Sequence, residues 1–238
     1  MLENEFDGEI ESQQKVPYSW FINPPSGMDS EMVREYNLKV GWFIPTTEAE
    51  TASLVPPNYL NQVEVKLGNE KSQKAGYLGM QMRIVVLHRS PIFAQVKDSG
   101  GKWVYAGVAY TRKGITTVGS KAKESKDYRL RNQYLVIPIG PNKELLTTIP
   151  IKITLSKGCG AALNNEIMEL RREIEEEYFK SLGKTQQALS DQAHARIIFD
   201  VVLGVHKGSG SNTSAFIVPK ARSRPTLNND QVGERNLV

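Results

Sequence analysis

The chain has 238 residues, of which 39% are apolar and 24% charged, with 19 glycines, 12 prolines and a formal net charge of +4. This length fits one large domain or two small ones, and the composition is typical of an all-β or α+β protein with many turns. A single cysteine excludes an internal disulfide, the acidic start of the chain does not resemble a secretory signal peptide, and no apolar run approaches the roughly 18 residues that cross a bilayer. We therefore expect a cytoplasmic protein without a membrane span.

The charges are unevenly distributed along the chain. Residues 1–14 carry five acids and no base, whereas residues 83–143 carry twelve bases and three acids. This asymmetry is the main functional signal in the sequence, because clustered lysine and arginine favour a polyanionic partner.

The apolar patterns predict three segments in chain order. Residues 1–15 have too few apolar side chains to join a core, so they are predicted to form a flexible acidic tail. Residues 16–219 are predicted to form a single β-rich domain, and residues 220–238 a polar C-terminal tail. Within the domain, a short helical stretch is expected at 29–36, and strands at 16–22, 38–44, 63–67, 77–88, 92–96, 102–109, 133–140, 149–155, 195–206 and 215–218.

Turn chemistry adds the connections. Residues 98–101 read Asp-Ser-Gly-Gly, which predicts a hairpin between 92–96 and 102–109, and a glycine-rich turn at 207–212 predicts a final hairpin. Residues 111–132 contain seven bases, two acids and few core-sized side chains, and are predicted to form a long exposed loop.

Residues 161–180 change to a helical period. Five apolar residues fall at steps of four, three, four and four on one face of a predicted amphipathic helix: Leu163, Ile167, Leu170, Ile174 and Tyr178. This stripe is predicted to lie on the sheet, and the alternative is that it meets the same helix of a second copy in a dimer. The predicted fold class is strand-rich α+β, an antiparallel β-barrel or sandwich, OB-like among the options, with one long amphipathic helix before the last hairpin.

Three stretches resemble an uncharacterised protein family found in cyanobacterial genomes. They are VPYSWFINP at residues 16–24, MRIVVLHRSP at 82–91, and YLVI at 134–137 continuing through PIKITLSKG at 150–158 to Ala161 and Ala162. The resemblance covers most of the predicted domain and implies a bacterial cytoplasmic protein, a domain of unknown function with no assigned activity. It transfers no site residue to this chain.

Neither a metal nor a cofactor is predicted. His88, His194, His206 and Cys159 are scattered without ligand spacing. Cys159 stands between two glycines before the helix, where a helix N-terminus would favour a thiolate, but a tight strand-to-helix turn explains the same residues. The segment 157–162 lacks the third glycine of a dinucleotide fingerprint and the Gly-Lys-Ser/Thr of a P-loop.

The basic stretch and its aromatic neighbours form the one candidate site. Lysine and arginine can follow the phosphates of a single strand while exposed rings stack on its bases. The predicted nucleic-acid-binding residues are Arg112, Lys113, Lys121, Lys123, Lys126, Arg129, Arg131, Trp103, Tyr105, Tyr110 and Tyr128.

Two functions follow from these patterns. The first is non-enzymatic binding of single-stranded DNA or RNA through a basic strand-and-loop surface around residues 83–143. The alternative is a structural or assembly protein that acts by self-association or by docking on a protein partner. An enzyme ranks third, because no convergent acid, base and nucleophile can be named from the sequence.

Overall fold

The computed structural model describes residues 16–22, 30–66, 73–112, 115–125, 127–186, 195, 197–207 and 213–223, with backbone alone at 30, 111, 112, 115, 116, 156–159, 174, 203–207 and 213–223. Its helices are α1 (Ser30–Glu35), α2 (Thr46–Thr51), α3 (Ser120–Glu124) and α4 (Lys157–Ser181). Its strands are β1 (Tyr18–Ile22), β2 (Gly41–Pro45), β3 (Asn61–Lys66), β4 (Gln73–Gly79), β5 (Gln81–Arg89), β6 (Phe93–Lys97), β7 (Trp103–Val108), β8 (Tyr110–Arg112), β9 (Ile115–Thr117), β10 (Tyr128–Pro138), β11 (Ile151–Ser156), β12 (Ile198–Lys207) and β13 (Thr213–Ser223).

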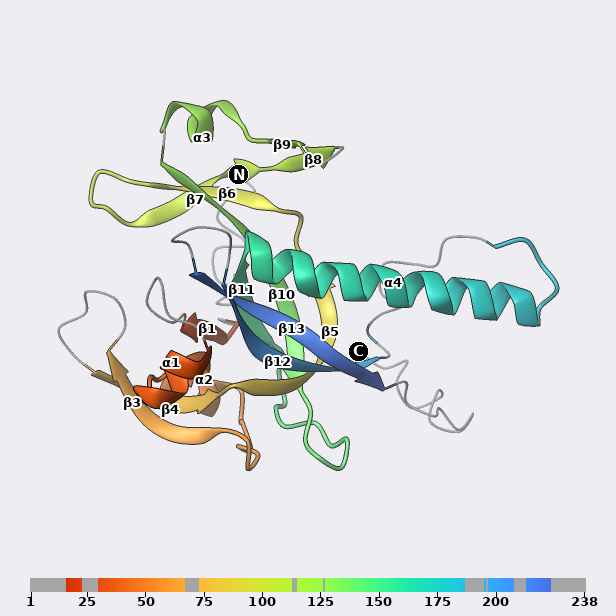
Figure 1. Cartoon of the computed structure of the whole chain (residues 1–238), viewed down its shortest axis with the longest axis horizontal. Coiled ribbons are helices and arrows are strands. Elements are labelled where there is room, and N and C mark those ends of the chain that lie inside the picture. Colours follow the sequence, from red (N-terminus) through yellow and green to blue (C-terminus); the bar gives the residue numbers. More distant parts are fainter. Residues whose placement is uncertain are drawn as a thin grey trace, which may run out of the picture.

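The strands within the described residues form one large open sheet and one small one. The large sheet follows the order β13-β12-β5-β10-β11-β1-β2-β4-β3, with β6 beside β10 and β7 beside β6, and the small sheet pairs β8 with β9 (Figure 1). The pair of β1 and β11 is parallel and the other pairs are antiparallel. The predicted strand-rich α+β class is confirmed, with a long helix before the last hairpin. An antiparallel barrel or sandwich is expected from the sequence; the structure instead has a mixed sheet that does not close into a barrel, because β13 and β3 stand at the two ends of the strand path.

The predicted strand at 77–88 is two strands that belong to different parts of the sheet. β4 pairs with β2 and β3, whereas β5 pairs with β10 and β12. The chain bends at Met80, after Gly79, whose backbone passes so close to its neighbours that a Cβ there would lie 2.6 Å from Leu60 Cδ2. The apolar alternation continues across this bend, which is why the sequence pattern reads as one strand.

The main core lies between the sheet and the first half of α4. Leu163, Ile167 and Leu170 are buried in the same cluster as core residues of β10 and β11, the strands of that cluster that α4 contacts. The predicted position of the helix on the sheet is confirmed for this half. Tyr178, further along the same stripe, is 51% exposed, and the outer half of α4 extends beyond the sheet (Figure 1). Of the helices in the described residues, none is both long and apolar enough to cross a membrane.

The length of β10 creates a separate lobe. Its second half pairs with β5 through residues 134–138, whereas residues 128–131 pair with β6 on the same edge. β6 in turn pairs with β7, so the β6–β7 hairpin continues the sheet past the end of β5. We call the unit formed by β6, β7, the first half of β10 and α3 the β6–β7 lobe; it lies at the top of Figure 1.

Candidate nucleic-acid interface

The hairpin of the β6–β7 lobe is fixed by its turn. The Asp98 carboxylate accepts hydrogen bonds from the backbone N–H groups of Gly100 and Lys102, at 3.0 and 2.8 Å. Gly101 has a φ of +75°, which glycine adopts without strain. The predicted hairpin at this position is confirmed, and its register determines which side chains of β6 and β7 share a face.

One face of the lobe is closed by α3. Ala94 and Val96 of β6 and Ala106 of β7 are buried against Val118 and Ala122, which lie just before and within α3. These are small side chains, so a helix of five residues covers them closely. This face is therefore a minor core covered by α3.

The opposite face carries aromatic and basic side chains. Because paired residues of antiparallel strands point to the same side, the pairs Gln95 with Tyr105, Lys97 with Trp103, and Gln95 with Arg129 place these residues together. We call this surface the aromatic–basic face; it consists of Phe93, Gln95, Lys97, Trp103, Tyr105, Arg129 and Arg131.

Arg129 is held in place by two neighbours. Its Nε donates a hydrogen bond of 2.8 Å to Oε1 of Gln95, and its guanidinium carbon lies 4.3 Å from the centre of the Trp103 ring. A guanidinium stacked on indole is favourable because the ring face is electron-rich. Together the two contacts fix the position and the plane of the guanidinium.

The environment of Arg129 disfavours its own positive charge. Burial and, to a smaller extent, repulsion by the Arg131 guanidinium together lower the pKa of Arg129 to about 10. Arg129 and Arg131 are alternate residues of β10, so their side chains lie on the same face. An anion bound between them would relieve both effects.

Lys97 adds a third cation at the edge of the same face. Its ammonium lies 5.2 Å from the centre of the Trp103 ring and 3.3 Å from a carboxylate oxygen of Asp127. Both partners of this ion pair are more than half exposed, so water screens it and a competing anion can replace the carboxylate.

Tyr105 provides the accessible ring. Its side chain is 59% exposed, and its ring centre lies 5.8 Å from that of the buried Phe93, at a tilt of 42°. Trp103 differs, because Arg129 already stacks on its ring. A base that approaches this face would therefore meet Tyr105 first.

The structure brings four of the predicted site residues together: Trp103, Tyr105, Arg129 and Arg131 on the aromatic–basic face. Three residues of the same face lie outside the predicted set, namely Phe93, Gln95 and Lys97. The sequence carried a usable signal for them, because a hairpin with its turn at 98–101 places alternate residues of 93–97 beside Trp103 and Tyr105.

The predicted loop at 111–132 is corrected to regular structure. It contains the last two residues of β8, all of β9 and α3, and the start of β10. It has few apolar residues, and two of them, Val118 and Ala122, fill the minor core against β6 and β7. Small side chains give a weak periodic signal even when they are buried.

Of the other predicted site residues, those whose side chains are described lie on α3, at the start of β10 and on β8. Lys121 and Lys123 are exposed on α3, which covers the opposite side of the lobe. Tyr128 alternates with Arg129 on β10 and so points to that side as well. Tyr110 is 70% exposed on β8, where Arg112 is described by backbone alone, and Lys113 and Lys126 lie outside the described residues.

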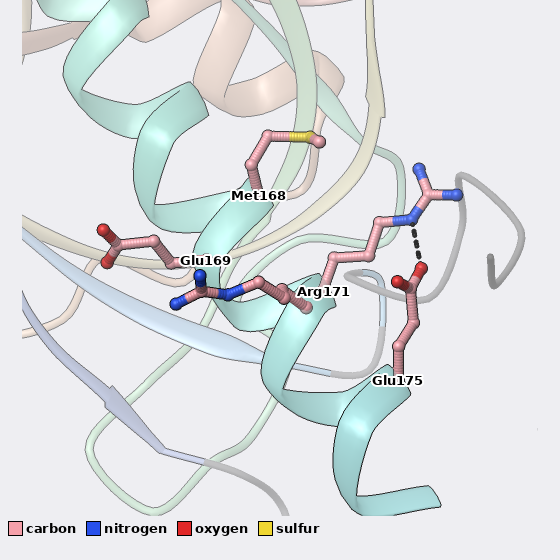
Figure 2. Close-up of a pocket in the computed structure, with 5 residues that line it drawn as sticks. Met168, Glu169, Arg171 and Glu175 are labelled. Carbon is pink, nitrogen blue, oxygen red and sulfur yellow. Dashed lines mark hydrogen bonds and ion pairs between the residues drawn. The ribbon is translucent and has the colours of Figure 1, made fainter. Parts of the chain in front are cut away.

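A second surface feature, a hollow of about 560 Å³, lies along α4. It is lined by Met168, Glu169, Arg171, Arg172 and Glu175. Figure 2 shows that Arg171 and Glu175 face each other one turn apart, while Glu169 points from the other side of the helix. The Arg171 Nε lies 3.0 Å from Oε1 of Glu175. Arg171 and Glu175 thus neutralise each other beside an open surface, an arrangement that suits helix stability better than catalysis.

Within the described residues, the structure adds no geometric support for metal binding by histidine and cysteine or for a reactive Cys159. Within the described part of the chain, no three His, Cys, Asp or Glu side chains gather as a metal site would require. Cys159 falls in the first turn of α4, but its side chain lies outside the described residues, as does the whole of His194.

The comparisons with known proteins identify a family whose function is not established. The model of a family described as Domain of unknown function (DUF5895) matches residues 13–231. No curated protein and no solved structure matches the chain.

Proposed function

The chain belongs to the family described as Domain of unknown function (DUF5895), and from the geometry of the aromatic–basic face we propose that it is a non-enzymatic protein that binds single-stranded DNA or RNA. The observation that carries the proposal is the placement of Tyr105 beside three cations on one side of a three-stranded unit. We further propose that the protein acts in a bacterial cytoplasm.

The chemistry of the face fits a strand with unpaired bases. A single strand presents phosphates at regular intervals and bases whose flat surfaces are open, and proteins bind it with cations along a groove and rings beneath the bases. Lys97, Arg129 and Arg131 supply the cations, and Tyr105 supplies the ring. The closed face under α3 leaves this side of the lobe as the binding surface.

The proposal is tested by titrating the full chain with a short oligothymidylate over a range of salt concentrations. Three phosphates neutralised by Lys97, Arg129 and Arg131 give a slope of log affinity against log salt of about −2, at about −0.7 per phosphate. Absence of binding at low salt would overturn the proposal.

A matched pair of variants separates the face from net charge. Replacing Lys97, Arg129 and Arg131 by Gln removes three positive charges from the face, and replacing Lys121, Lys123 and Lys180 by Gln removes three from exposed positions on α3 and α4. We expect the first variant to lose most of its affinity and the second to retain it. Equal losses would mean that only the overall charge matters.

One observation favours the second function, assembly through self-association. The outer half of α4 extends beyond the sheet (Figure 1) and exposes Tyr178, Leu182 is exposed just after the helix, and Met168 is exposed earlier in it. A solution mass above that of one chain, unchanged by nuclease and lowered by replacing Tyr178 and Leu182 with Ser, would support assembly through this helix. A solution mass equal to that of one chain would contradict assembly through this helix.

A further inference from the structure

The aromatic–basic face contains a residue whose hydrogen-bonding capacity is only partly used. The Nε of Arg129 donates to Gln95, and one face of its guanidinium lies against the Trp103 ring. Among the described residues, nothing accepts a hydrogen bond from its two terminal nitrogens. An arginine with a fixed plane and two available terminal nitrogens is suited to binding a phosphate through two parallel hydrogen bonds.

The charge around Arg129 points to an anion as its partner. The neighbouring Arg131 repels it and burial disfavours its charge, so the cation is poorly compensated in the unbound protein. The carboxylate of Asp127 lies next to Lys97 at the edge of the face. A phosphate that binds Arg129 meets a preorganised donor, and among the described residues it displaces no ion pair of Arg129.

The position of Tyr105 sets what lies next to that phosphate. Tyr105, Gln95 and Arg129 occupy facing positions on three adjacent strands, so Gln95 stands between the ring and the guanidinium. Adjacent strands are about 4.8 Å apart, which separates the Cα atoms of Tyr105 and Arg129 by about 10 Å. Long side chains at this spacing can reach a phosphate and a base of the same strand.

From this arrangement we infer that Arg129 binds a backbone phosphate through its two terminal nitrogens while Tyr105 stacks on a base of the same strand, so that the face recognises a nucleotide unit and not a polyanion in general. This inference rests on the proposed function and deepens it. Gln95 and Trp103 are positioning residues that act through Arg129.

The test uses two probes and two variants of the full chain. The probes are an oligothymidylate and an abasic oligomer of the same length, which keeps the phosphates and lacks the bases. Arg129→Lys keeps the charge but loses the paired donors. We therefore expect it to lower the affinity for both probes about tenfold and to leave the dependence of affinity on salt unchanged. Tyr105→Ala is expected to lower the affinity for the oligothymidylate by about fivefold to about 150-fold and to leave the affinity for the abasic probe unchanged.

Matched controls exclude general effects of these substitutions. Tyr36→Ala removes an exposed tyrosine that follows α1, outside the predicted binding residues, and Arg172→Lys makes the same change at an exposed arginine on α4. Neither is expected to alter the affinity for either probe. Gln95→Leu is expected to weaken both probes in the wild-type background and to add nothing in the Arg129→Lys background, which a merely structural role would not produce.

The outcomes separate the inference from the proposed function. If the wild-type chain binds neither probe at low salt, both the proposed function and this inference are wrong. If it binds the oligothymidylate but Arg129→Lys binds within about twofold of wild type, the role of Arg129 is wrong and the proposed function stands. If Tyr105→Ala weakens both probes equally, the recognition of a base at Tyr105 is wrong.

Discussion

Arg83 and Asp200 face each other across β5 and β12, and two hydrogen bonds join them, from Arg83 Nε to Oδ1 at 2.6 Å and from Nη2 to Oδ2 at 3.4 Å. Arg83 also donates through Nη1 to the backbone oxygen of Pro141, at 3.1 Å. The hydrogen bond with Asp200 is the main cause that raises the pKa of Arg83 above its ordinary value. The pair therefore ties the last hairpin and the turn after β10 to a central strand.

Breaking this pair is expected to loosen the last hairpin. Arg83→Met and Asp200→Asn should each lower the free energy of unfolding by about 1 kcal/mol, a modest value because both side chains are about 30% exposed. Urea unfolding of the two single variants and the double variant measures the coupling. Strictly additive effects would contradict a direct interaction.

The phenol of Tyr59 is expected to make the stability of the protein depend on pH in alkali. Its hydroxyl donates to the backbone oxygen of Ile139 at 2.9 Å, and burial raises its pKa from 10.0 to about 12. Below pH 10 the phenol is neutral in both states, and between pH 10 and about 12 it ionises first in the unfolded chain, so stability falls as pH rises through this window. We expect Tyr59→Phe to be about 1 kcal/mol less stable at neutral pH and to lose less stability than wild type in alkali.

The control for this prediction is an exposed tyrosine. Tyr110→Phe should leave the alkaline unfolding curve unchanged, because Tyr110 is largely exposed on β8. If Tyr59→Phe and wild type lost stability in parallel above pH 10, the buried phenol would not be the group that titrates.

Gly160 is expected to reject alanine although it lies in a helix. A Cβ at this position would lie 2.5 Å from Asn132 Oδ1 and 3.0 Å from its Cγ, and the backbone oxygen of Gly160 accepts a hydrogen bond of 2.8 Å from the Tyr134 hydroxyl. Helix propensity alone would make Gly160→Ala stabilising by about 1 kcal/mol. We expect the opposite sign, a loss of about 1–3 kcal/mol on thermal or urea unfolding.

A second substitution tests the cause of that loss. Asn132→Ala removes the atoms that would collide with the new methyl group, so the double variant should be less destabilised than the sum of the two single variants. An additive result would place the cost of Gly160→Ala elsewhere.

The acidic start of the chain is expected to compete with nucleic acid. Residues 1–14 carry five carboxylates and no base, and the aromatic–basic face carries Lys97, Arg129 and Arg131. Deleting residues 1–14 should tighten oligothymidylate binding at low salt, and the gain should shrink as salt rises because the competition is electrostatic. Unchanged affinity would remove the role of this segment and leave the proposed function untouched.

Local chemistry was sufficient for several elements. The Asp98 turn specifies its hairpin through hydrogen bonds within five residues, and the spacing of Leu163, Ile167 and Leu170 specifies the buried side of α4. Both signals depend on residues that are near in the chain, so they are visible before any tertiary contact forms.

The remainder depended on contacts between distant residues. Met80 divides a continuous apolar alternation because Gly79 must pass Leu60, and Val118 and Ala122 become core only when α3 meets β6 and β7. The sequence by itself determined that the middle of the chain is basic and aromatic. Only the tertiary structure decided that Arg129 and Arg131 share a face with Tyr105 while Lys121 and Lys123 do not, because a strand register is set by pairing across the sheet and a one-residue shift would turn every side chain to the other side.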